Sequence, residues 1–208
     1  MKKFLLIDDH EVVRSGIRGL LSEIYKPCEV FEAINTETAT EKLKQQHYDL
    51  VLIDIQMPNS DSLGLMDYIN IRYPDTKVLV FSMSSENIYA KRFLKAGAKG
   101  FLSKDSSLDE IKKAINLVLS NRRYVSDTLA ESLAFQSTSN SPENPFEKLS
   151  QREFEIASLL LSGQTVSEVS KSLNLQTSTV GTHKSRIFEK LGIGNILDLK
   201  ELATSYNL

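Results

Sequence analysis

The stretch Phe4-Leu5-Leu6-Ile7-Asp8-Asp9 joins an uninterrupted apolar run to two acids, and residues 50–54 repeat this arrangement with a single acid. An apolar run without polar alternation is typical of a strand that is covered on both faces of a parallel sheet. Further short apolar runs lie at residues 30–31, 78–81 and 101–102. The pattern predicts five strands in the first half of the chain.

Segments with helical spacing separate these runs. One face of the first helix is expected to hold six apolar residues, namely Val12, Val13, Ile17, Leu20, Leu21 and Ile24. The following helices are expected at about residues 36–46, 62–73, 86–97 and 107–121. Alternating strands and helices imply right-handed βαβ units. We therefore expect an α/β domain over residues 1–122, with a doubly wound, five-stranded parallel sheet of flavodoxin-like type.

The composition changes after Tyr124. Residues 123–145 read as a linker with a short helix at 126–135, because residues 136–145 are polar and include two prolines. From Phe146 onward a small all-α domain is expected, with four helices at about 151–162, 166–173, 177–191 and 195–206. Ser150 and Glu153 form a capping box for the first of these helices, and Gly163 marks its end.

Length and composition set broad limits on function. The 208 residues suit one large or two small domains, and the net charge of −2 does not indicate a nucleic-acid binder, so that function must be argued locally. The single cysteine, Cys28, excludes an internal disulfide and fits a reducing compartment. Because no apolar run approaches the ~20 residues of a membrane span, we expect a cytoplasmic protein without a membrane partner.

Polar residues follow four of the expected strands at their carboxyl ends: Asp8 and Asp9, Asp54, Ser82 and Lys104. These ends line one crevice in an open α/β sheet, which is the usual ligand site. Three acids crowded there need cations, and Lys104 and a bound Mg²⁺ are both plausible. Such a site suits phosphoryl transfer to a carboxylate. Each residue alone has an ordinary interpretation as a helix cap, a surface charge or a loop residue.

Four stretches, at residues 5–10, 51–58, 81–82 and 97–104, together resemble a receiver domain. The resemblance covers about residues 1–122 and implies that Asp54 accepts a phosphoryl group from a sensor histidine kinase. It also implies that Asp9 and Asp54 bind Mg²⁺ through their carboxylates and Gln56 through its backbone carbonyl, with Asp8 in support.

The same resemblance assigns the phosphoryl oxygens to Ser82 and Lys104, and it implies that the ring of Phe101 reorients when Ser82 moves inward. The sequence departs from the commoner pattern of the family at Asn59 and Ser62, where glycines often stand, and at Met83, where a small residue is usual. A larger side chain at Met83 would hinder access of water, so we expect slow loss of phosphate.

The third helix of the second domain is amphipathic. Its inward stripe is expected to hold Val180, His183, Ile187 and Leu191, and its outer face Ser178, Gly181, Thr182, Ser185 and Glu189, with Lys184 and Arg186 on the flanks. Residues 174–176 form the short turn that a helix-turn-helix requires. A plain surface helix with a solvated polar face would show the same pattern.

Residues 149–153, 160–163, 168–169, 177–183 and 190–193 resemble a LuxR-type helix-turn-helix, and the whole chain resembles the NarL/FixJ family of response regulators. The resemblance implies a two-component regulator that controls transcription by binding double-stranded DNA and is not an enzyme. It implies DNA contacts from the third helix, at Ser178, Thr179, Gly181, Thr182, Lys184, Ser185 and Arg186. It also implies a homodimer in the active state, with the last helix (Ile196, Leu197, Leu199, Leu202 and Ala203) at the dimer contact.

One departure weakens the expected DNA contact. Gly181 stands where the family commonly has Lys or Arg, and the residues from Phe146 onward hold seven Lys/Arg and seven Asp/Glu. Phosphate attraction should therefore be modest, and an interaction-only regulator that no longer binds DNA is a rival interpretation. A hydrolase with an aspartate nucleophile is a second rival, but such enzymes commonly need an acid two residues further on, where Gln56 stands.

Overall fold

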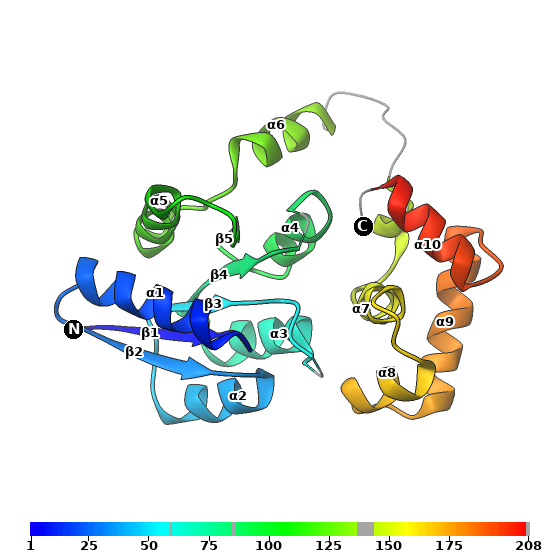
Figure 1. Ribbon diagram of the computed structural model, residues 1–208, viewed down its shortest axis with the longest axis horizontal. Helices are drawn as coiled ribbons and strands as arrows, with labels where there is room; N and C mark the ends of the chain where they lie inside the picture. The colour runs from blue at the N-terminus through cyan, green and yellow to red at the C-terminus, as the bar shows by residue number, and fades with distance from the viewer. Residues whose placement is uncertain (59, 85, 137–143, 207–208) are drawn as a thin grey trace. The chain divides into compact units, whose positions relative to one another are not determined.

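The computed structural model describes residues 1–208 except 59, 85, 137–143 and 207–208, and its chain divides into two units, Met1–Ser132 and Leu133–Leu208. The expected strands and helices of the first unit are present (Figure 1). The strands are β1 Lys2–Ile7, β2 Cys28–Ala33, β3 Leu50–Ile53, β4 Lys77–Ser82 and β5 Gly100–Ser103. The helices are α1 Glu11–Ile24, α2 Thr36–Gln45, α3 Ser62–Arg72, α4 Glu86–Lys95 and α5 Leu108–Leu119, and the boundary between the units falls within α6 Asp127–Gln136.

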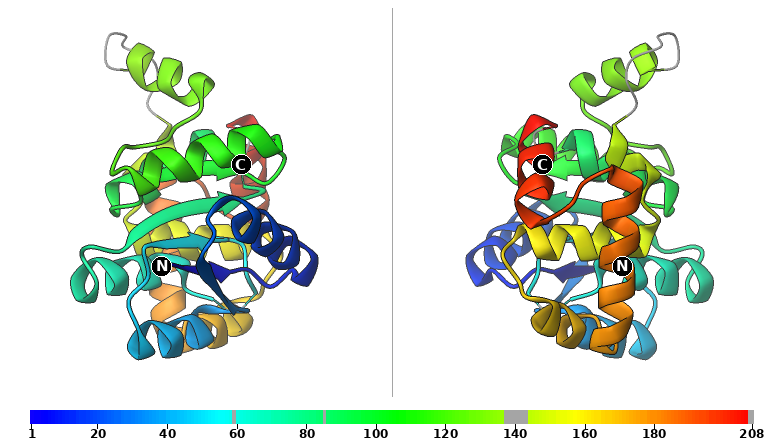
Figure 2. Two further views of the ribbon diagram at one scale, coloured as in Figure 1. Left: turned by 90° about the vertical axis from the view of Figure 1, so that its left-hand side faces the viewer. Right: turned by 90° about the vertical axis from the view of Figure 1, so that its right-hand side faces the viewer.

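Every strand pair of the described sheet is parallel, in the order β2-β1-β3-β4-β5, which confirms the expected doubly wound α/β fold. α1 and α5 cover one face of the sheet, and α2, α3 and α4 cover the other (Figures 1 and 2). Strand residues such as Phe4, Leu52 and Phe81 form a core with Leu21 of α1 and Ile115 of α5. The inner strands carry continuous apolar runs, at residues 4–7, 50–53 and 78–81, because both of their faces are covered.

β2 is longer than the sequence pattern predicted, because its six residues pair in register with β1 from Lys2 opposite Cys28 to Ile7 opposite Ala33. It lies at the edge of the sheet, and its charged residues interrupt the apolar run by which a strand is predicted. The expected apolar face of α1 is also wrong at one position. Val12 is 84% exposed, and Arg14 lies on the buried stripe instead.

The second unit is helical, with a 3-10 helix η1 at Pro145–Lys148 that the sequence pattern did not predict. Its helices are α7 Gln151–Leu161, α8 Val166–Ser172, α9 Thr177–Leu191 and α10 Ile196–Ser205. The capping box of Ser150 and Glu153 begins α7, and Gly163 follows the end of that helix with a φ of 92°. Most of the expected linker at 136–145 lies outside the described residues.

The small core of this unit is built around α9, which packs against η1, α7 and α8. Val180 and Ile187 of α9 are buried as predicted, together with Ile156, Leu160, Val169 and Leu173. Leu199 and Ala203 of α10 are also buried, so they belong to the core of the unit, whereas Leu197 is 66% exposed. Within the described residues, no helix is long and apolar enough to cross a membrane.

Candidate functional site

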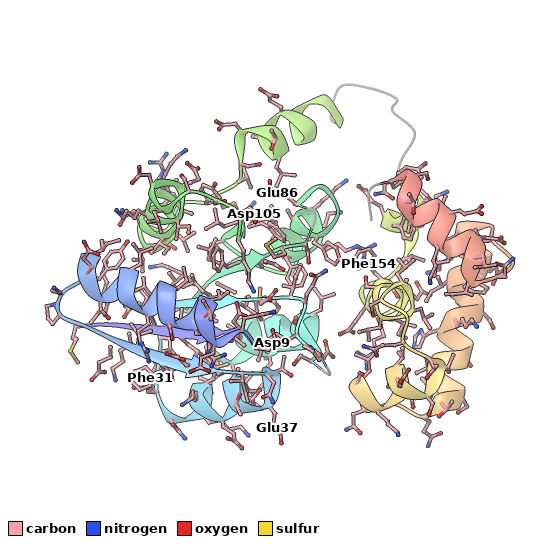
Figure 3. All side chains as sticks on the ribbon, viewed as in Figure 1. Asp9, Phe31, Glu37, Glu86, Asp105 and Phe154 are labelled. Carbon is pink, nitrogen blue, oxygen red and sulfur yellow. The ribbon has the colours of Figure 1, made fainter. Side chains whose placement is uncertain are left out.

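The parallel sheet brings the expected polar residues to one edge. Asp8 directly follows β1, Asp54 directly follows β3, Ser82 is the last residue of β4 and Lys104 directly follows β5. These four strands are neighbours in the sheet, so their carboxyl ends meet. Figure 3 shows Asp9 at the same edge. The structure therefore places together the residues that the sequence spread over about 100 positions.

The Asp54 carboxylate lies at the centre of this group and is 4% exposed. Its Oδ2 atom is 2.6 Å from Lys104 Nζ. Its Oδ1 atom accepts hydrogen bonds from Ser82 Oγ at 2.6 Å and from the backbone N–H of Gln56 at 3.0 Å. A buried carboxylate needs such donors, and here they also fix the direction in which its oxygens point.

Lys104 bridges two acids, because its Nζ atom is also 2.7 Å from Asp8 Oδ2 and its side chain is only 8% exposed. Burial alone would lower the pKa of Lys104, but the hydrogen bonds that its ammonium group donates to Asp54 and Asp8 outweigh it and hold that pKa above its ordinary value of 10.5. The amine is thus charged at neutral pH. Its stabilising contribution is fully present below about pH 10.5 and is lost only as the pH rises through the higher folded value.

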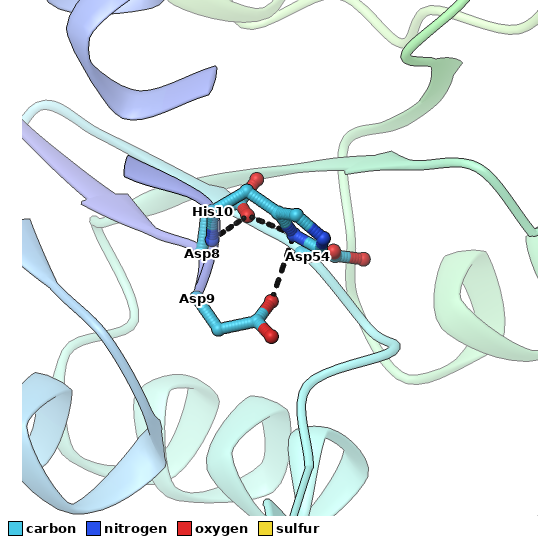
Figure 4. A group of neighbouring side chains, drawn as sticks. All are labelled: Asp8, Asp9, His10 and Asp54. Carbon is cyan, nitrogen blue, oxygen red and sulfur yellow. Dashed lines mark hydrogen bonds and ion pairs between the residues drawn. The ribbon is translucent and has the colours of Figure 1, made fainter. Parts of the chain in front are cut away.

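Oxygen donors for a metal ion gather beside this ion pair (Figure 4). Ligand atoms of Asp8, Asp9, His10 and Asp54 all lie within 4.8 Å of one another. His10 Nδ1 lies 3.2 Å from Asp8 Oδ1 and 3.0 Å from Asp9 Oδ1. A cluster of carboxylates with one partly exposed member fits Mg²⁺, which prefers one or two carboxylates and keeps several waters.

Ser82 belongs to a short chain of hydroxyl groups. Ser84 Oγ is 3.2 Å from Ser82 Oγ, and the backbone N–H of Ser84 donates to the same atom at 3.3 Å. Met83, between them, is 57% exposed. Phe101 is fully buried, and its backbone N–H donates to the carbonyl of Tyr124 at 3.3 Å. Ser84 was missed because a serine two residues after a strand carries no distinctive sequence signal.

A second contact beside the site was also missed. Glu86, in the first turn of α4, accepts hydrogen bonds from Ser126 through its Oγ at 2.5 Å and its backbone N–H at 3.3 Å. Ser126 Oγ in turn accepts from the N–H of Leu129, at the start of α6. Residues 124–126 thus contact both β5, which contains Phe101, and α4, which follows Ser82 in the chain.

The outer face of α9 carries the predicted DNA-contact residues. Ser178, Thr182, Ser185 and Arg186 are exposed, and Thr179, Gly181 and Lys184 are half-buried. The hydroxyl groups of Thr182 and Ser185 donate to the carbonyls of Ser178 and Gly181, one turn earlier. Lys184 Nζ lies 5.4 Å from the centre of the Phe188 ring.

His183, on the inner side of α9, is half-buried, and its Nδ1 atom is buried without a partner among the described residues. This placement agrees with the interpretation of His183 as a packed helix residue.

Two family models match the chain. The response regulator receiver domain matches residues 4–116, and the LuxR family of bacterial regulatory proteins matches residues 147–203. The chain therefore belongs to the response regulators of the NarL/FixJ family, which join these two domains, and it is a regulator and not an enzyme.

Among its relatives are the response regulators GacA of Pseudomonas protegens and UvrY of Escherichia coli, each 36% identical. The matches cover all of this chain and 98% of GacA or 96% of UvrY. A solved structure of RcsB from Salmonella typhimurium is similar in fold, with a TM-score of 0.80 over 99% of this chain and 98% of that one, at 23% identity. Another RcsB structure, from Salmonella enterica bound to the promoter rprA, gives a TM-score of 0.75.

Proposed function

We propose that the chain is a two-component response regulator in which Asp54 accepts a phosphoryl group from a sensor histidine kinase and thereby controls DNA binding and transcription. One observation carries the proposal. The Asp54 carboxylate is held at 2.6 Å from both Lys104 Nζ and Ser82 Oγ at the ligand edge of the sheet, next to two further acids. We take residues 1–122 as the receiver, 123–145 as the linker and 146–208 as the DNA-binding domain, acting in the cytoplasm.

The chemistry is a transfer between two nucleophiles. A carboxylate oxygen of Asp54 forms the new bond to phosphorus, the phosphorus–nitrogen bond of the donor phosphohistidine breaks, and the electron pair returns to the imidazole. Lys104, already charged and held in place, neutralises negative charge on the phosphoryl oxygens. Ser82 is within reach to donate its hydroxyl proton in a hydrogen bond to the same oxygens.

Mg²⁺ would be held by Asp9 and Asp54, by the backbone carbonyl of Gln56, and by Asp8 in support. Bound there, it supplies positive charge that neutralises the phosphoryl oxygens during transfer. The backbone N–H of Gln56 already lies 3.0 Å from Asp54 Oδ1, which keeps this residue beside the acid cluster.

Transmission to the second domain follows from the contacts of residues 124–126. Ser82 and Lys104 are drawn toward the new phosphoryl oxygens, and Phe101 reorients with them, so the ends of β4 and β5 shift. Tyr124 contacts the backbone of Phe101, and Ser126 contacts Glu86, so both shifts reach the start of α6. We propose that this two-state change releases the DNA-binding domain or favours a homodimer.

DNA contact is assigned to α9, which would enter the major groove of double-stranded DNA. Lys184 and Arg186 are assigned to phosphate contacts and Thr182 and Ser185 to base edges, because Thr182, Ser185 and Arg186 are exposed and the half-buried Lys184 lies on the flank of the same face. The bound promoter in an RcsB structure and the RcsB dimers on DNA in another support this assignment by analogy with proteins of the same fold.

The phospho-acceptor role is tested with Asp54→Asn. The wild type and the variant are incubated with Mg²⁺ and phosphoramidate, and the phosphorylated fraction is measured by gel mobility and located by mass spectrometry. We expect labelling of the wild type at Asp54 and none of the variant. The matched control is Asp105→Asn, which changes an exposed acid next to Lys104 and should be labelled normally. Normal labelling of Asp54→Asn would contradict the proposal.

An interaction-only regulator is the second candidate, and the absence of a side chain at Gly181 in a module with equal numbers of acidic and basic residues favours it. Binding to duplex DNA measured over a range of salt concentrations separates the two. A DNA-binding domain shows an affinity that falls as salt rises, whereas an interaction-only module shows no binding that depends on salt.

A further inference from the structure

Arg14 is a buried cation at the base of the acid cluster. It lies in the first part of α1, on the same stripe as Ile17 and Leu21, and is only 9% exposed. Arginine is rarely buried unless it is paired, because the loss of hydration costs several kcal/mol. Its burial at a position where the helix could carry an apolar residue therefore calls for a specific partner.

The guanidinium of Arg14 joins two strands. Its Nε atom donates to Glu32 Oε2 of the edge strand β2 at 2.9 Å. Its Nη1 atom donates to the backbone carbonyl of Asp8 at 2.8 Å, in a buried position. The planar, forked guanidinium makes the two contacts from two different nitrogen atoms in a fixed geometry, which the single nitrogen of a lysine does not reproduce.

The carbonyl of Asp8 belongs to the peptide that links Asp8 to Asp9, the two acids that follow β1. The position of this peptide determines the positions of the two Cα atoms that carry the Asp8 and Asp9 side chains. The backbone N–H of Asp8 is held by Ala33 at 3.1 Å, and Arg14 holds the carbonyl on the other side of the residue. Arg14 also places a positive charge against the Asp8 residue of the acid cluster.

We propose that Arg14 is a positioning residue for the divalent cation. It fixes the Asp8–Asp9 peptide so that the Asp8 and Asp9 carboxylates are held ready for Mg²⁺ beside Asp54, without touching the metal itself. The inference rests on the proposed function, because it assigns Arg14 to the same site. Partners of this kind orient metal ligands, and their loss typically lowers metal affinity about 10- to 100-fold.

Arg18 provides a matched control on the same helix. It pairs with the other oxygen of Glu32, with its Nη1 atom 2.7 Å from Oε1, and its side chain is 52% exposed. Arg18 lies one helical turn further along α1 than Arg14. Within the described residues, its guanidinium donates a hydrogen bond to Glu32. Arg14→Met and Arg18→Met therefore each remove one cation from Glu32, but only Arg14→Met frees the Asp8 carbonyl.

The test is a calorimetric titration of the full-length protein with Mg²⁺ alone. We expect Arg14→Met to weaken Mg²⁺ binding about tenfold and Arg18→Met to change it by less than about twofold. Wild-type affinity in folded Arg14→Met, or equal losses in the two variants, would overturn the proposal. If Arg14→Met does not fold, the decision passes to Arg14→Lys. Lysine offers one nitrogen atom in place of the two that Arg14 uses, so affinity about threefold weaker is expected and wild-type affinity would overturn the proposal.

A second measurement separates positioning from general damage. The rate of labelling by phosphoramidate is followed as a function of Mg²⁺ concentration. A positioning role raises the Mg²⁺ concentration needed for half the maximal rate and leaves the maximal rate within about twofold. A loss of maximal rate at unchanged half-saturation would overturn the proposal. Failure of the phospho-acceptor assignment itself would appear elsewhere, as normal labelling of Asp54→Asn.

Discussion

Met83 directly follows Ser82, whose hydroxyl contacts the phospho-acceptor carboxylate, and it is 57% exposed. A thioether side chain there can cover the acyl phosphate and restrict the approach of water. Met83→Ala should therefore shorten the half-life of the phosphorylated protein, by about threefold or more, equivalent to a lower barrier of about 0.7 kcal/mol.

The half-life is measured by the decay of the phosphorylated band after the donor is removed. Ile71→Ala is the control, because Ile71 is a similarly exposed apolar residue in the last turn of α3. An unchanged half-life of phosphorylated Met83→Ala would contradict the proposal that Met83 restricts the approach of water to the acyl phosphate.

Glu153 is a buried acid of the second domain and is 4% exposed. Burial alone would raise the pKa of its carboxyl, but hydrogen bonds from Lys190 at 2.6 Å and from Ser150 hold that pKa below its ordinary value of 4.5. The folded pKa is depressed, so the stabilisation is present above about pH 4.5 and is lost as the pH falls through the folded value.

Glu153→Gln should lower the local stability of α7 by about 1–2 kcal/mol at pH 7, and the difference from the wild type should narrow below about pH 4.5. Hydrogen exchange of the α7 amides, read by mass spectrometry, measures it. Glu189→Gln, at an exposed position of α9, is the control and should have little effect at either pH. A difference that stays constant from pH 7 to pH 3 would show that the charge of Glu153 is irrelevant.

Helix α9 has room for a basic residue that it lacks. No atom would lie within 4 Å of a Cβ added at Gly181, apart from its own helix backbone and chain neighbours. Gly181→Lys should raise DNA affinity and steepen its salt dependence by about 0.9 in the slope of log K against log salt, as expected for one more phosphate contact.

Gly181→Ala is the control for Gly181→Lys, because the loss of glycine by itself stabilises a helix by about 1 kcal/mol. Fluorescence anisotropy with a duplex of unrelated sequence, measured over a range of KCl concentrations, gives both slopes. If Gly181→Ala strengthened binding as much as Gly181→Lys did, helix order and not charge would limit binding.

The strands and helices were predictable from the sequence where burial is uniform. β3 is apolar along its whole length and β1 from Phe4 onward, and the acids that follow them indicated the site from the sequence alone. The edge strand β2 was underestimated, because Glu29 and Glu32 interrupt its pattern.

Other features depend on contacts between distant residues. Arg14 falls on the buried stripe of α1 at the right spacing, and a cation at a core position was a usable signal that was overlooked. The pairing of Glu86 with Ser126, 40 positions apart, had no counterpart in local sequence.

At the scale of the whole molecule, the contact between Glu86 and Ser126 is expected to carry part of the response. Activation with beryllofluoride and Mg²⁺ should raise the DNA affinity of the wild type by about fivefold or more, within the usual range of allosteric coupling. Glu86→Ala should retain about half or less of that ratio, because it frees α4 from Ser126 yet leaves the Ser126 hydroxyl to cap α6.

Glu37→Ala is the matched control, since Glu37 is likewise an acid in the first turn of a helix, α2. Its response to beryllofluoride should equal that of the wild type. A full response in Glu86→Ala would show that the signal reaches the DNA-binding domain by another route.

The burial of Tyr124 and Leu129 has a practical consequence for exchanging domains between regulators. Both residues are no more than 3% exposed, and the backbone carbonyl of Tyr124 accepts a hydrogen bond from the backbone of β5. A chimera joined at residue 122, where α5 has already ended, would lack the buried ring of Tyr124. The receiver domain would then have a cavity beside β5. The donor sequence should therefore extend beyond Leu129 before foreign output sequence begins.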